Sequence, residues 1–235
     1  MIRLDKYLSN AGYGSRTEIK KLIKDGIVSV NGGICSDPSR KVTLSTQIKL
    51  NSKIILSKPV STIMLNKPKD YVSSNESEAG YPSVIELIQQ PHPKYAIAGR
   101  LDVDTTGLMI LSTQGELVHS IISPSKKVSK VYKADVINFK DEAIQFFFQG
   151  MELTKDFKTK PVTSFQVLDE KNGIATISIG IIEGKFHQVK RMFQYIQAEV
   201  IKLERIAIGS LKLDPSLKHG EYRELTETEI QLIFS

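Results

Sequence analysis

The sequence predicts an α+β protein in two parts: a small basic α/β module, then a larger domain whose mixed, mainly antiparallel sheet is flanked by helices. Three observations predict this. Positive charge is concentrated in the first quarter of the chain, short helix and strand patterns fill that quarter, and the remainder alternates short apolar stretches with turns. We place the domains at residues 1–58 and 61–235, because SKPVS at 57–61 interrupts the apolar pattern with a proline.

Composition limits the function classes. The chain has 235 residues, of which 40% are apolar and 25% charged, enough to build a folded core. Residues 1–60 hold 11 Lys/Arg against 4 Asp/Glu, so the whole net charge of +6 belongs to this first quarter and favours a polyanionic partner. The single cysteine, Cys35, excludes a disulfide framework, and we expect it to be buried. Without a long apolar run or a signal-peptide core, we expect a cytoplasmic protein with no membrane partner.

The stretch at 14–26, GSRTEIKKLIKDG, is typical of a short helix with both ends marked. Ser15 and Glu18 form a capping box, and Gly26 lies just past the last turn. On one face of this helix lie the apolar residues Ile19, Leu22 and Ile23, and on another the cations Arg16, Lys20 and Lys24.

Two flanking stretches complete the module. Segment 3–10 offers Leu4, Tyr7 and Leu8 to the same small core, and IVSVNGG alternates as a strand that turns at 31–32. A charged helix face is more often simply solvated, but here it coincides with the uneven distribution of charge. The stretch RLDKYLSNAGYGSR, the basic helix and VSVNG together resemble the S4 RNA-binding domain. That resemblance implies a helix presented to RNA phosphates, with the contacts made by Arg3, Arg16, Lys20 and Lys24.

The larger domain alternates short strands and helices, with too few strand-helix-strand units for a doubly wound parallel sheet. The predicted strands are 62–66, 108–112, 130–139, 162–168, 173–182 and 200–208. The predicted helices are 83–90, 115–122, 141–150 and 186–197, and in the last of these Phe186, Val189, Phe193 and Ile196 form the apolar stripe.

Two carboxylates, Asp102 and Asp104, stand two positions apart in AGRLDVDTTGLMILS. D-x-D-T resembles the nucleophile motif of magnesium phosphatases. That motif needs a hydrophobic strand directly before the first aspartate and a downstream Gly-Asp-x-x-x-Asp, and this sequence has neither. We therefore expect no metal, although a carboxylate pair alone does not exclude magnesium. A second interpretation is that both aspartates cap the turn into the strand, which suits Asp104 and its threonine neighbours.

As a whole, GRLDVDTTGL resembles the catalytic motif of pseudouridine synthases, which implies that Asp102 is the catalytic residue and Asp104 structural. Two further stretches support the resemblance. SKVYKADV supplies Tyr132, which by itself would be interpreted as a half-buried core residue, and which by resemblance stacks on the target base. GKFHQVKRMFQYIQ supplies Arg191, which by resemblance forms an ion pair with Asp102. His187 lacks partners at zinc-ligand spacing.

The resemblance extends over nearly the whole chain, through IMLNKPKDYV, KTKPV and LERIAIGSLKLDPSLKHGEYRELTETEI. It is strongest to the small-subunit (16S) ribosomal RNA pseudouridine synthases of the RsuA family with an N-terminal S4 domain, chiefly through GKFHQVKRMF. Large-subunit relatives tend to have Asn-Arg-Glu-Val-Arg-Arg there. One departure is Asp70, where the family usually has glycine. The RNA contacts expected in this domain are Arg100, Lys130, His187 and Lys190.

The resemblance implies isomerisation of a flipped-out uridine, of the uridine-516 class, in ribosomal RNA. Asp102 attacks C1′ of the ribose or removes a sugar proton, Tyr132 is a candidate proton acceptor, and Arg100 fills the gap left by the base or binds phosphate. No cofactor is expected, and the protein is expected to act as a monomer on small-subunit RNA or an assembly intermediate. The alternatives are a non-catalytic S4-type RNA-binding or ribosome-assembly factor, and a large-subunit synthase.

Overall fold

The computed structural model describes residues 1–55 and 60–235, so most of the proposed boundary at 57–61 lies outside the described residues. The chain forms two compact units. The first comprises Met1–Thr62 with two later segments, Ile88–Ala96 and Ser112–Gln114, and the second comprises the remainder. The domain ranges 1–58 and 61–235 therefore stay a prediction.

The first unit is a small α/β module in which two helices share one core with short antiparallel strands. The helices are α1 (Leu4–Asn10) and α2 (Arg16–Lys24). The sheet has the order β3 (Gly33–Ile34), β2 (Val28–Val30), β5 (Ile48–Leu50) and β6 (Lys53–Ile54), while β1 (Ile2–Arg3) pairs with β4 (Lys41–Val42).

Local sequence signals account for this module. The capping box of α2 is confirmed, since Ser15 and Glu18 bond to each other's backbone N–H groups. The hairpin turn is also confirmed, with positive φ at Asn31 and Gly32, as a two-residue turn between β2 and β3 requires. The expected apolar residues are in the core, and so is Cys35. The cations of α2 (Arg16, Lys20 and Lys24) are all exposed, as a surface that meets phosphate needs.

A buried carboxylate orients two arginines of this module. Asp5 is fully buried and accepts two hydrogen bonds from Arg3, at 3.1 and 2.9 Å, and Arg16 lies 3.8 Å from it. The hydrogen bonds from Arg3 lower the pKa of Asp5 despite its burial. One anion therefore holds together two of the cations that were expected to contact RNA.

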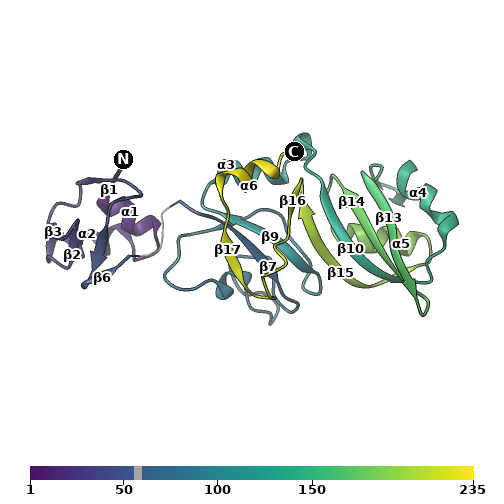
Figure 1. The fold of residues 1–235 in the computed structure, drawn as a ribbon, viewed down its shortest axis with the longest axis horizontal. Helices are drawn as coiled ribbons and strands as arrows, with labels where there is room; N and C mark the ends of the chain where they lie inside the picture. Colours follow the sequence, from purple (N-terminus) through teal and green to yellow (C-terminus); the bar gives the residue numbers. More distant parts are fainter. Residues whose placement is uncertain (56–59) are drawn as a thin grey trace. The chain divides into compact units, whose positions relative to one another are not determined.

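The second unit is built on a nine-stranded mixed sheet, in which β9 and β15 are parallel and the pairings of β10, β13, β14, β16 and β17 are antiparallel (Figure 1). All six predicted strands are present. The main path runs β13 (Ser164–Lys171), β14 (Ile174–Ile181), β10 (Lys130–Ile137), β15 (Glu199–Ile208), β9 (Thr106–Ser112), β7 (Thr62–Lys67) and β17 (Tyr222–Glu224); β8 (Ala96–Ile97) pairs with β9, β16 (Leu211–Lys212) with β15, and β11 (Glu152–Thr154) with β12 (Phe157–Lys158) separately.

Helices cover this sheet where their apolar faces meet it. Helix α5 (Gln188–Tyr195) contacts β15, and α6 (Glu227–Leu232) contacts β16. Phe193 of α5 packs against Phe147 of α4 (Ile144–Gln149), with ring centroids 5.0 Å apart. The remaining helices are α3 (Gly115–Ile122) and the 3-10 turns η1 (Val84–Leu87), η2 (Pro124–Lys126) and η3 (Asp141–Ala143).

Three predicted helices are shorter than expected, and in segment 141–150 the 3-10 turn η3 precedes α4. Segment 83–90 forms only the 3-10 turn η1, because prolines at 91 and 93 follow it and disfavour helical backbone in the residues before them. The helix predicted at 186–197 begins at Gln188. Phe186 therefore lies outside the buried stripe, and it is 76% exposed while Val189 and Phe193 are buried.

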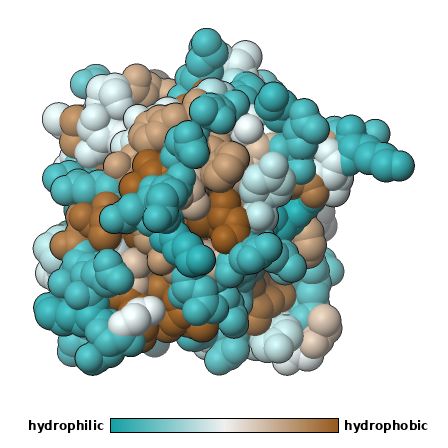
Figure 2. Space-filling model, turned by 90° about the vertical axis from the view of Figure 1, so that its right-hand side faces the viewer, coloured by the Kyte–Doolittle hydropathy of each residue, from teal (hydrophilic) through white to brown (hydrophobic). Residues whose placement is uncertain are grey.

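The end of the second unit that carries α4 shows apolar surface between hydrophilic side chains (Figure 2). Phe146 and Phe148 of α4 and Tyr195 of α5 are each about half exposed, and the rings of Phe146 and Tyr195 meet edge to face. This contact extends the aromatic packing between α4 and α5 out to the surface.

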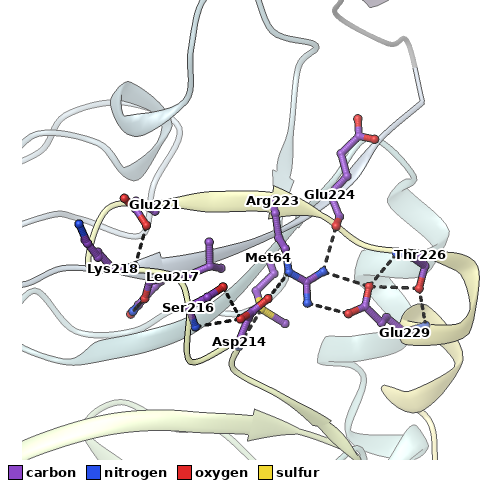
Figure 3. A network of polar contacts seen from close by, with 11 residues as sticks. Met64, Asp214, Ser216, Leu217, Lys218, Glu221, Arg223, Glu224, Thr226 and Glu229 are labelled. Carbon is purple, nitrogen blue, oxygen red and sulfur yellow. Dashed lines mark hydrogen bonds and ion pairs between the residues drawn. The ribbon is translucent and has the colours of Figure 1, made fainter.

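An ion-pair network around Arg223 of β17 fixes the C-terminal segment (Figure 3). The guanidinium bonds to Asp214 and, in two bonds of 3.1 and 2.7 Å, to Glu229 of α6. Hydrogen bonds from Ser216 and Arg223 lower the pKa of Asp214 to about 2, and those led by Arg223 lower the pKa of Glu229 to about 2. Because β17 pairs with β7, the network anchors the strand that ends at Lys67.

Candidate active site

The stretch that contains the aspartate pair is a loop between β8 and β9, clamped from both sides. Before Asp102, Leu101 exchanges two hydrogen bonds with Ser73, whose Oγ accepts from its N–H at 3.0 Å and donates to its carbonyl at 2.7 Å. After Asp102, the N–H of Thr105 donates to the carbonyl of Asp102 at 3.1 Å, closing a turn. The Asp102 carboxylate is held at the surface of this loop, 28% exposed.

Beneath the loop lies a buried lysine that the sequence analysis did not single out. Lys67, at the end of β7, is fully buried and its ammonium donates to four backbone carbonyls, those of Pro68, Asp102, Val103 and Thr105, at 3.0 to 3.2 Å. Burial lowers the pKa of Lys67 to about 8, opposed by the charges of nearby aspartates. Its signal in the sequence is weak, a lysine between asparagine and proline at a strand end, and its role depends on tertiary structure.

Asp70, the departure from the family's glycine, closes the same region. It has φ of 65°, in the left-handed region where glycine is usual, and its N–H donates to the carbonyl of Val103 at 2.9 Å. The aspartate thus adopts a left-handed backbone conformation, which glycine would adopt at lower cost.

Two basic side chains, those of Lys190 and His187, lie beside the Asp102 carboxylate, and Lys190 also bridges to Asp104. Lys190 of α5 lies 3.3 Å from the Asp102 carboxylate and donates to Asp104 at 2.6 Å, and His187 Nε2 lies 3.6 Å from Asp102. Partial burial alone would raise the pKa of Asp104, but the hydrogen bond and charge of Lys190 lower it. Asp104 therefore does more than cap the turn, because it holds the lysine that faces Asp102.

The expected ion pair between Arg191 and Asp102 is wrong by one residue. The Arg191 guanidinium lies 5.8 Å from the ring centroid of Phe157, and Lys190 takes the place beside the carboxylate. Successive residues of a helix point about 100° apart, so only one of these two neighbours can face the loop. The basic pair was placed on the correct helix, but which of the two met the aspartate depended on how α5 packs.

Tyr132 lies on β10 and borders the same cleft as Asp102. It is 7% exposed, and so it meets both interpretations made from the sequence, a core tyrosine and a residue of the site. The cleft is lined by Arg100, Leu101, Asp102, Thr105, Tyr132, Ile181, Gly184, Lys185, His187, Gln188, Val189 and Leu203. Exposed cations at Arg100 and Lys185 border a cleft that has a carboxylate and a phenol among its polar groups.

Lys130, expected to contact RNA, is turned inward instead. Its ammonium donates to the carbonyls of Ile121 and Val128, at 3.2 and 2.7 Å, near the end of α3. Burial lowers the pKa of Lys130 to about 8. A lysine held in this way stabilises the loop after α3 and is not placed to meet phosphate, so this prediction is corrected.

The described residues contain no group of three or more His, Cys, Asp or Glu side chains that could hold a metal ion. The aspartate pair is instead occupied by Lys190, a cation from within the chain. Among the helices of the described segments, none is long and apolar enough to span a membrane.

Comparisons with known proteins identify the family of the chain. Residues 61–195 match the family model of RNA pseudouridylate synthase, and residues 2–48 match that of the S4 domain. The chain therefore belongs to the RNA pseudouridylate synthase family. It is an RNA pseudouridine synthase with an N-terminal S4 domain, and RNA is its substrate class.

Similarity extends over the full length. The chain is 36% identical to the ribosomal small subunit pseudouridine synthase A of Vibrio parahaemolyticus, covering 100% of both chains. It is 35% identical to the ribosomal large subunit pseudouridine synthase B of Bacillus subtilis, covering 98% of this chain and 95% of that one. A crystal structure of a pseudouridylate synthase has 33% identity, a TM-score of 0.68, and coverage of 99% and 100%.

Proposed function

We propose that this enzyme converts a uridine of small-subunit ribosomal RNA, of the uridine-516 class, into pseudouridine, with Asp102 as the catalytic residue. The observation that carries the proposal is the Asp102 carboxylate, which stands at a cleft beside Tyr132 and is paired with Lys190. The small-subunit assignment is supported by the stretch GKFHQVKRMF and by the full-length relative named for the small subunit.

The reaction is an isomerisation, so atoms and electrons balance within the substrate. The N1–C1′ bond breaks, the base turns over, C5 joins C1′, and the proton that leaves C5 is balanced by one gained at N1. As the base departs, the sugar carbon becomes electron-poor, and an anion beside it stabilises this state. Asp102 serves either by attack on C1′ or by removal of a sugar proton, and both routes need its carboxylate.

Lys190 orients this carboxylate, and Asp104 in turn orients Lys190. The target uridine cannot react within a stack, so it is flipped into the cleft at a cost of a few kcal/mol. Stacking on Tyr132 returns part of this, since one base–aromatic contact contributes about 1–3 kcal/mol. Tyr132 is also the candidate acceptor for the C5 proton.

Phosphate contacts position the RNA for this step. In the first unit, Arg16, Lys20 and Lys24 are exposed along α2, and Arg3 is oriented by Asp5. In the second unit, Arg100 and Lys185 border the cleft. Such contacts supply affinity and register, while the choice of uridine depends on the RNA around the cleft.

The test is to map pseudouridines across ribosomal RNA from cells with the gene, without it, and with it replaced by the Asp102→Asn form. We expect one small-subunit site to disappear in the second and third strains. Loss of a large-subunit site instead would support the alternative indicated by the 35% identical large-subunit relative. An unchanged map in the strain without the gene would contradict the proposal.

A further inference from the structure

An exposed aromatic ring stands next to the active-site cleft without a role in the chemistry above. Phe186 is 76% exposed, and its ring stacks on that of His187 with centroids 3.8 Å apart and planes 17° from parallel. One face of the phenyl ring is therefore covered by the imidazole, and the other is free to receive a further flat group.

The position of this stack relates it to the reaction. His187 lines the cleft and its Nε2 lies 3.6 Å from the Asp102 carboxylate. The order outward is therefore carboxylate, imidazole, phenyl. Phe186 itself is not part of the cleft lining, so it stands one ring outside the place where the target base must lie.

The backbone keeps the ring outside the core. His187 has φ of 51°, a left-handed conformation that is unfavourable for a non-glycine residue, and α5 begins only after it. The apolar side chains that follow in the helix, Val189 and Phe193, are buried, whereas Phe186 is exposed. The ring is therefore accessible to a partner from outside the chain.

The surrounding charges indicate what that partner is. Arg100 and Lys185 are exposed and line the same cleft as His187, so the cleft that the stack borders carries positive charge. A phenyl ring with nearby cations is a typical combination for single-stranded nucleic acid, since every base has a π-face and every nucleotide a phosphate.

We propose that Phe186 stacks on the unpaired base of the nucleotide next to the target uridine. When the target is flipped toward Asp102 and Tyr132, its neighbour is left at the mouth of the cleft, where the free face of Phe186 is exposed. The Phe186–His187 stack then holds the flanking nucleotide and fixes the register of the target. This role is distinct from catalysis and does not depend on which ribosomal subunit supplies the RNA.

The test uses short single-stranded RNAs with one central uridine and 2-aminopurine on its 5′ or 3′ side, since stacking on an aromatic ring quenches 2-aminopurine fluorescence. We expect the unaltered enzyme to quench one of the two probes. Phe186→Ala and Phe186→Leu should abolish the quenching and weaken binding about 5- to 150-fold. Phe186→Tyr, which keeps a ring, should retain both. Phe148→Ala, which removes a half-exposed ring of α4, is the matched control and should change neither.

Salt dependence separates stacking from charge. Stacking releases no counterions, so Phe186→Ala should leave the slope of log K against log salt unchanged, whereas Lys185→Ala should flatten it by about 0.7 if it meets a single-strand phosphate. Failure of the unaltered enzyme to quench either probe, or equal affinity of Phe186→Ala and Phe186→Tyr, would overturn the proposal.

Discussion

The two units of this molecule use their cations in opposite ways. In the first unit, the side chains of Arg16, Lys20 and Lys24 are exposed along one helix. In the second, Lys67 is buried among backbone carbonyls and Lys190 is shared between two carboxylates. The same residue types are thus exposed in one place, where we propose that they meet phosphate, and help to build a carboxylate site in the other. What surrounds a cation decides its role, and counts of charge along the sequence cannot show this.

The largest effect is expected from removing the negative charge of Asp102, around which the cations of the second unit are arranged. Asp102→Asn keeps the shape of the side chain but removes the anion, so pseudouridine formation should be abolished while RNA binding stays within a few-fold. Asp104→Asn should keep measurable turnover, because Lys190 still faces Asp102. Single-turnover assays and filter binding check both. Full activity of Asp102→Asn would contradict the assignment.

A matched pair on α5 tests the corrected ion pair. Lys190→Met removes the cation beside Asp102 and should lower kcat by roughly 100-fold, as expected when a catalytic group is misplaced by about 1 Å. Arg191→Met removes a cation that lies over Phe157 and should leave kcat near normal. A larger loss of kcat in Arg191→Met than in Lys190→Met would support the ion pair between Arg191 and Asp102 that family resemblance implies.

The exposed cations of the first unit are expected to act on binding alone. Replacing Arg16, Lys20 and Lys24 with alanine should weaken RNA binding by roughly 10- to 100-fold at physiological salt. If each meets a phosphate of a duplex-like region, the salt slope should flatten by about 0.9 per contact. The rate at saturating RNA should hardly change. A triple variant with normal affinity and slope would show that this face is simply solvated.

A smaller effect is expected from the buried lysine as pH rises. Lys67 has a pKa of about 8, below the ordinary value near 10.4, so above pH 8 it loses a proton that bonds the Asp102 loop. Activity should therefore fall a few-fold as pH passes through about 8. The free energy of unfolding should instead increase as pH rises from about 8 to 10.4, because the unfolded chain binds the proton of Lys67 more tightly than the folded chain does.

Two variants identify the group that causes the fall in activity above pH 8. Lys130→Met removes the other lysine with a pKa of about 8 and should preserve the decline, since that residue lies at the loop after α3. Lys67→Met should have a lower rate at every pH and should not show the fall in activity above pH 8. Rate–pH profiles together with denaturant unfolding measure both quantities, and a decline that persists in Lys67→Met would assign it to another group.

The smallest effect is expected from metal removal. The aspartate pair is bridged by Lys190, and the described residues offer no cluster of three metal-ligating side chains. Product should form at an unchanged rate in EDTA on RNA folded in monovalent salt. A strict magnesium requirement on a short, unstructured RNA would revive the interpretation of Asp102 and Asp104 as a metal site.

The features that sequence predicts well here are those decided by near neighbours. The capping box of Ser15 and Glu18 and the turn at 31–32 depend on residues within a few positions, and both are present as expected. The strand bearing Tyr132 follows from local alternation. Resemblance pointed to Asp102 through a motif that keeps its residue order, and the catalytic role of this residue stays a prediction.

The features that sequence missed depend on contacts between distant segments. Lys67 meets the Asp102 loop across some 35 positions of chain. Whether Lys190 or Arg191 faces that loop depends on the rotation of α5 by about 100°. Phe186 was assigned to the buried stripe because helical spacing was extended two residues beyond the true start of α5, and the left-handed turn at His187 ended that spacing.

Gly107 carries a consequence for the mutational tolerance of the whole enzyme. It follows the catalytic loop with φ of 101°, at the two-residue parallel pairing of β9 with β15, and a β-carbon there would lie 2.4 Å from the carbonyl oxygen of Arg205. Any other L-amino acid would have to push the two strands apart where they join both halves of the sheet. In a library of random variants, this position should admit no substitute, although it contributes no atom to the chemistry.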